Sequence, residues 1–85
     1  MKINNIKVGN KLWYVSAEFD GCSLREVEVT EKAEDHILCR PTDPKDQDIT
    51  LWFDNEDINK SLTDDYNVAI DRYREGKKNV INYIV

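Results

Sequence analysis

The sequence predicts an α+β protein in which a small antiparallel sheet of four to five strands, curled into a barrel or half-barrel, precedes a C-terminal helix. Short segments of alternating apolar residues, with turn residues between them, recur about every eight to twelve residues in the first part of the chain. From residue 61 onward the apolar residues recur at helical spacing. Curling removes exposed strand edges, which a chain of 85 residues has little other structure to protect.

The densest strand pattern lies at 49–58. A period of two places successive side chains on opposite faces of a strand. Ile49, Leu51 and Phe53 therefore share one face, and Thr50, Trp52 and Asp54 share the other. Four shorter strands are predicted before it, at 3–8, 11–19, 24–30 and 36–40.

Turn residues separate the first strands. Gly9-Asn10 suits a turn because both residues tolerate positive φ, and Asp20-Gly21 is a common hairpin signal. Large side chains on both faces of 11–19 predict a strand that is covered on two sides. In 24–30 only Val27 and Val29 alternate with polar residues, which predicts one packed face and one wet face.

The C-terminal segment predicts a helix that Ser61 or Thr63 caps. Acidic residues follow the cap and basic residues come later, which complements the helix dipole. Gly76 interrupts the apolar stripe. The helix either runs unbroken to about Ile84 or ends at Gly76, followed by a second short element, and we prefer the break.

The length fits one domain, 1–85, with a β-rich part at 1–58 and a helical part at 61–85. Neither a signal-peptide core nor a run long enough to span a bilayer is visible, so we expect a cytoplasmic protein that does not enter a membrane. In that compartment Cys22 and Cys39 are expected to be free thiols.

Negative charge is concentrated in the middle of the chain. The net charge is −5, yet residues 41–65 alone contain eight acidic residues and two lysines. Such a segment repels the phosphate backbone of nucleic acids, so we expect no direct nucleic-acid binding. A protein with a basic surface is the better candidate partner.

Few residues suggest metal binding or catalysis. His36 and Cys39, with Cys22 more distant, are the soft-metal ligands, and a zinc site needs three or four. The aspartates of the 43–48 loop lack the glycine and the final glutamate of a calcium loop. The sequence has no Gly-rich phosphate loop and no nucleophile elbow, so we expect neither a cofactor nor an enzyme.

Two pairs of adjacent aromatic residues, Trp13-Tyr14 and Trp52-Phe53, fall on predicted strands. Neighbouring residues of a strand point to opposite faces, so one aromatic of each pair should pack in the core. The other should lie outside or under the helix, where an exposed ring could contribute to a partner surface.

The order of these motifs resembles small SH3-like or Tudor-like barrels, and also short uncharacterised proteins of bacteriophages and mobile elements. The resemblance rests on Val8-Gly9 before Lys-Leu-Trp-Tyr-Val, on Ile-Leu-Cys-Arg, and on Leu-Trp-Phe-Asp before Ser-Leu-Thr. It implies a binding module that acts on a host factor, and it carries no catalytic residues over. The glycine framework of KOW-type RNA-binding barrels is missing.

Three functions remain open from the sequence. The first is a non-enzymatic protein-interaction module that presents an acidic surface, and the second is an inhibitor of a DNA- or RNA-handling enzyme that mimics nucleic acid. The third is a small metal-binding protein centred on His36 and Cys39. For the interaction module, the predicted partner-binding residues are Asp43, Asp46, Asp48, Trp52, Asp54, Glu56 and Asp57, with either Trp52 or Trp13 as the hydrophobic anchor.

Overall fold

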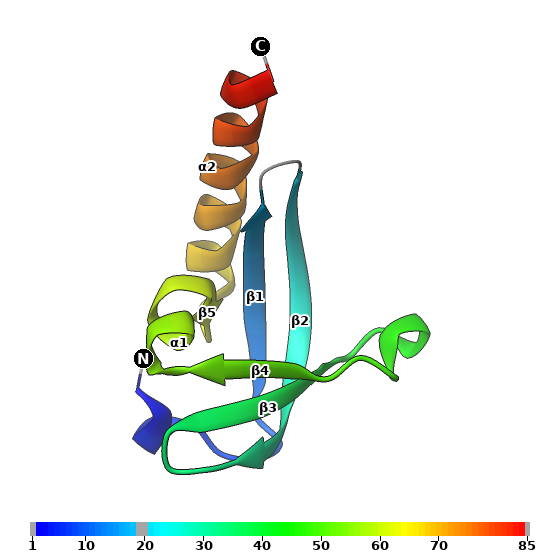
Figure 1. Cartoon of the computed structure of the whole chain (residues 1–85), viewed down its shortest axis with the longest axis vertical. Helices are drawn as coiled ribbons and strands as arrows, with labels where there is room; N and C mark the ends of the chain where they lie inside the picture. The colour runs from blue at the N-terminus through cyan, green and yellow to red at the C-terminus, as the bar shows by residue number, and fades with distance from the viewer. Residues whose placement is uncertain (1, 19–20, 85) are drawn as a thin grey trace.

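A computed structural model describes residues 2–18 and 21–84 of the chain (Figure 1). Its elements, in order, are η1 (Ile3–Asn5), β1 (Lys11–Glu18), β2 (Gly21–Lys32), β3 (His36–Pro41), η2 (Pro44–Asp46), β4 (Leu51–Asp54), α1 (Asn55–Ser61), β5 (Leu62–Thr63) and α2 (Tyr66–Ile84). The η elements are single turns of 3₁₀ helix.

Over these residues the five strands form one antiparallel sheet in the order β4-β3-β2-β1-β5. The sheet curls into a half-barrel, and α1 connects the strands at its two edges, β4 and β5 (Figure 1). The predicted fold class, a small curled antiparallel sheet followed by a C-terminal helix, is confirmed.

The inner face of the sheet holds the core. Val27 and Val29 of β2 are almost fully buried there, as their alternation predicted. Side chains before β1 and in α1 complete the same cluster, which comprises Ile3, Ile6, Leu12, Val27, Val29, Ile37, Cys39, Phe53, Ile58 and Leu62. Each such apolar side chain contributes about 1.5–3 kcal/mol of transfer free energy on burial.

The opposite face of β1 is covered by α2. Trp13 packs edge-on against Tyr66 with ring centroids 4.7 Å apart, and Val15 and Ala69 are buried. Tyr14, on the inner face, meets Phe53 at 4.9 Å. The predicted covering of this strand on both sides is therefore confirmed.

The predicted turn at Gly9-Asn10 is present. Gly9 has φ of 94°, a region that favours glycine, and its N–H donates to the Val29 carbonyl at 2.8 Å. Strands β1 and β2 form the predicted hairpin with Glu18 opposite Gly21. The two residues of its connection, 19–20, lie outside the described residues.

Two predicted strands differ in the structure. In 3–8 the apolar residues Ile3 and Ile6 are three positions apart, and a 3₁₀ turn, which repeats every three residues, directs both into the core. The strand expected at 49–58 covers only Leu51–Asp54. It ends there because Asp54 caps α1, so Asn55–Ile58 are helical and the β-rich part does not extend to residue 58.

The predicted helix start and break are also wrong. Ser61 lies in α1 and Thr63 in β5, so a strand falls within the part expected to be helical. The Asp65 carboxylate accepts from the N–H groups of Asn67 and Val68 and caps α2 instead. The helix continues through Gly76, which is buried where α2 packs along β1 and β2.

Candidate partner-binding surface

The outer face of β3 and β4 exposes an aromatic side chain. Register pairs β4 with β3 so that Leu38 lies opposite Trp52, and His36 lies opposite Asp54. Phe53, between the two outward-facing residues of β4, is buried, whereas Trp52 is 53% exposed. The prediction that one aromatic of each adjacent pair packs inside is confirmed here.

Trp52 does not stand alone on this face. The His36 ring stacks on it with centroids 5.4 Å apart and an interplanar angle of 27°. On its other side His36 contacts Asp35, whose Oδ1 lies 2.7 Å from Nδ1 of the imidazole. These three residues, Asp35, His36 and Trp52, are called the Trp52 cluster below.

Hydrogen bonding fixes the charge of Asp35. The bond from His36 lowers the pKa of the Asp35 carboxyl below its usual range, aided by the backbone N–H of Asp35. The carboxylate is therefore ionised at neutral pH, which its exposure to solvent also favours. An ionised carboxylate only accepts hydrogen bonds, so Nδ1 of His36 carries the proton.

The loop before β4 holds the first group of predicted acidic residues. Asp43 caps η2, where its side chain accepts from the Lys45 N–H at 3.0 Å. Asp46 lies 3.8 Å from the Arg25 guanidinium, a surface pair of small energetic value, and Asp48 is exposed.

The second group lies at the start of α1. Asp54 and Asp57 form a capping box, in which the Asp57 N–H donates to Asp54 Oδ1 at 2.9 Å and the Asp54 N–H donates to Asp57 Oδ2 at 3.3 Å. Glu56 forms an ion pair with Lys60 at 2.8 Å, which raises the pKa of the lysine. These acids have structural partners within the helix.

The structure therefore divides the predicted acidic surface in two. Asp43, Asp46 and Asp48 lie in the loop before β4, whereas Asp54 ends β4 and Glu56 and Asp57 lie in the first turn of α1 (Figure 1). The first three residues of β4 therefore lie between the two groups along the chain. Trp52 lies between the two groups.

Replacing Asp54 with alanine is expected to lower the free energy of unfolding by about 1 kcal/mol, because the N–H of Asp57 loses its acceptor. Asp54→Asn removes the same charge but keeps a side-chain oxygen, so its stability should stay close to that of the wild type. Urea denaturation of both variants measures the difference. Equal losses would show that charge, not the hydrogen bond, stabilises the start of α1.

Asp35 and His36 are the members of this surface that the sequence did not single out. The sequence suggested a role for His36 only as a metal ligand. Its stacking on Trp52 depends on the register between β3 and β4, which places the two rings diagonally across the pair. No local pattern in the sequence contains that register.

The candidate metal ligands are separated from one another. His36 faces outward, whereas Cys39, three positions further along the same strand, is fully buried in the core on the opposite face. Cys22 is on another strand and its Sγ lies 3.6 Å from the Tyr73 carbonyl. Within residues 2–18 and 21–84, no three His, Cys, Asp or Glu side chains are grouped so that they could hold a metal ion.

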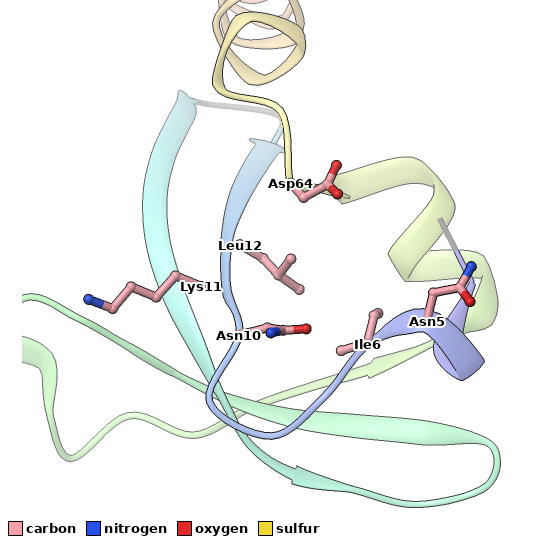
Figure 2. A pocket seen from close by; sticks show the side chains of 6 residues that line it. All are labelled: Asn5, Ile6, Asn10, Lys11, Leu12 and Asp64. Carbon is pink, nitrogen blue, oxygen red and sulfur yellow. The ribbon is translucent and has the colours of Figure 1, made fainter.

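A pocket of about 420 Å³ lies at the start of β1 and is lined by Asn5, Ile6, Asn10, Lys11, Leu12 and Asp64 (Figure 2). Ile6 and Leu12 belong to the core, and the Asn10 Oδ1 already accepts from the Lys7 N–H at 2.8 Å. In Figure 2 the Lys11 side chain points away from the other five. Asp64 is the one carboxylate of the lining, so the pocket presents no pair of acids for proton transfer.

Comparison with known proteins found no family model, no curated protein and no solved structure that matches this chain. The surface must therefore be interpreted from its own chemistry. Neither α1 nor α2, the α-helices of the described chain, combines the length and the apolar character that crossing a bilayer requires.

Proposed function

We propose that this chain is a non-enzymatic protein-interaction module that binds a partner with a basic surface through Trp52 and the acidic residues on both sides of it. The exposure of Trp52 carries the proposal. Tryptophan is among the residues that most often dominate the binding free energy of protein interfaces. Because the ring is half exposed in the folded chain, a partner that buries it would gain additional transfer free energy.

The charge around Trp52 supports a basic partner. Within the described residues no ion pair involves Asp43, Asp48, Asp54 or Asp57. Lys60 is near enough for Asp57 and Asp54 to help raise its pKa, but its ion pair is with Glu56. The capping hydrogen bonds orient Asp54 and Asp57 but leave them negative. Charge of this kind accelerates encounter with an oppositely charged surface and selects against acidic partners.

The architecture suits such a role. Trp52 is on a strand whose other face is anchored in the core by Phe53, and its ring is held against His36. A side chain that is already ordered loses less conformational entropy on binding, which increases affinity.

The test is retention of partners from a bacterial lysate by the tagged chain, with the retained proteins identified by mass. Trp52→Ala is expected to lower the affinity for the specific partner by about thirtyfold or more, which is the loss typical of a central aromatic contact. Val8→Ala is the matched control, because it shortens another exposed apolar side chain that belongs to neither β3 nor β4. Equal retention by the wild type and Trp52→Ala would contradict the proposal.

The contribution of charge is tested with Asp43→Asn/Asp48→Asn, which leaves the capping box of α1 intact. The control variant, Asp71→Asn/Glu75→Gln, removes the same charge from exposed positions of α2. Only Asp43→Asn/Asp48→Asn should reduce binding of the partner. The reduction should be smaller at high salt, because salt screens the charges.

A partner that handles DNA or RNA and is displaced by duplex DNA would identify the module as an inhibitor that mimics nucleic acid. Two negative groups separated by β4 are compatible with that function. A partner that nucleic acid does not displace would favour the general interaction module.

A further inference from the structure

We propose that protonation of His36 regulates binding at Trp52, so that the surface binds a basic partner more weakly in mildly acidic than in neutral solution. The effect on partner binding rests on the proposed function. The coupling between the His36 and Trp52 rings can be measured on the isolated chain.

The geometry of the Trp52 cluster identifies the nitrogen that titrates. Nδ1 of His36 donates to the ionised Asp35 carboxylate in both charge states of the ring. The proton is therefore gained and lost at Nε2. The histidine side chain is 30% exposed, so solvent can supply that proton without unfolding of the strand.

Protonation changes what Trp52 contacts. The neutral imidazole stacks on the indole as one aromatic ring on another, whereas the imidazolium is a cation against the same π-face. The charged ring is attracted more strongly, so it holds Trp52 more firmly in the stacked position. It also adds a positive charge 5.4 Å from the centre of the indole, where a basic partner would bind.

The other charged groups on the neighbouring elements are mostly acidic. They are Glu34 and Asp35 in the turn before β3, Asp54 opposite His36 on β4, and Glu31 and Lys32 at the end of β2. His36 is the one histidine of the chain, and carboxylates titrate mainly below pH 5. Among side chains of ordinary pKa, histidine alone changes charge between pH 8 and pH 5.5.

The direct experiment follows both tryptophan indole N–H signals by NMR between pH 8 and pH 5.5. The Trp52 signal is expected to move with the same midpoint as the ring signals of His36. Trp13 is an internal control, because it packs against Tyr66 on the other side of the sheet and should move little. A Trp52 signal that is flat over this range would overturn the inference.

His36→Phe separates the proton from packing, because phenylalanine keeps an aromatic ring beside Trp52 but has no titratable nitrogen. The Trp52 signal should lose its pH dependence in this variant. If the same transition persisted, another group would be its source and the inference would fail. His36→Asn should lose the transition as well, which covers the case in which the phenylalanine variant does not fold.

The effect on binding is measured with a nonalysine peptide as a model basic partner. A unit charge about 5 Å from the site in water corresponds to roughly fourfold weaker binding at pH 5.5 than at pH 8. His36→Phe should bind equally at both pH values. The pull-down with Trp52→Ala is done at a single pH and does not depend on the titration of the surface. If the pH dependence is absent, the pull-down still tests the proposed function separately.

Discussion

Replacing Phe53 with alanine is expected to lower the free energy of unfolding by about 3–5 kcal/mol. The ring is 4% exposed, lies in the core cluster and meets Tyr14 edge-on at 4.9 Å, so its removal leaves a cavity lined by fixed neighbours. A chain of 85 residues has a total stability of about 4–13 kcal/mol. Urea denaturation should therefore show a much lower midpoint or a largely unfolded variant.

Trp52→Ala is the matched control for that experiment, because it removes the neighbouring aromatic from the exposed face of the same strand. Its expected loss is below about 1 kcal/mol, since the indole is half exposed and contributes mainly its stack on His36. Similar losses for the two variants would mean that Trp52 is a structural residue, and its exposure would then say nothing about a partner.

Raising the pH from 9 to 11 is expected to destabilise the protein through Cys39. Burial raises the pKa of this thiol from 9.0 to about 11, because the core does not solvate a thiolate. The unfolded chain ionises first, so the stability that the neutral thiol provides is complete below pH 9 and is lost as the pH rises toward 11. The shift corresponds to about 2–3 kcal/mol.

Other groups also titrate in this range, so the measurement is a comparison of urea denaturation between the wild type and Cys39→Ala. The variant should start less stable at pH 8 because of the lost side-chain volume, and the difference should shrink toward pH 11. Cys22→Ala leaves Cys39 in place and should follow the wild type. Parallel curves for the wild type and Cys39→Ala would contradict this account of the buried thiol.

Strands β1 to β4 could be predicted because each has a strongly apolar face. Val27 and Val29 alternate with glutamates, and Phe53 alternates with Trp52 and Asp54, so the period of two directly identifies the inward side. The SH3-like resemblance stays a prediction, since the comparisons found no matching family model, curated protein or solved structure.

The misplaced end of β4 and the misplaced start of α2 occur where polar side chains decide the local structure. Asp54 fits a strand by its spacing, but its pairing with Asp57 starts a helix one residue later. Asp65, not the earlier Ser61 or Thr63, satisfies the first N–H groups of α2. The alternation of apolar and polar residues indicates only which side chains are buried. The sequence contains several polar residues that could cap a helix, and burial does not distinguish between them.

The candidate site was predictable in its parts but not in its arrangement. An exposed tryptophan between acidic segments follows from the pattern around β4. The separation of the acids into two groups follows from the length of the strand between them, and the contact with His36 follows from strand pairing across a loop. Such long-range geometry is set by the whole sheet.

The position of β5 has a consequence for synthesis of the protein. Its two residues pair with Trp13 and Tyr14, about fifty positions earlier, and the Arg72 guanidinium donates to the Leu62 carbonyl at 3.1 Å. A nascent chain leaving the ribosome therefore keeps the outer edge of β1 without its partner until Leu62 and Thr63 emerge. During that interval the unpaired edge exposes the growing polypeptide to aggregation.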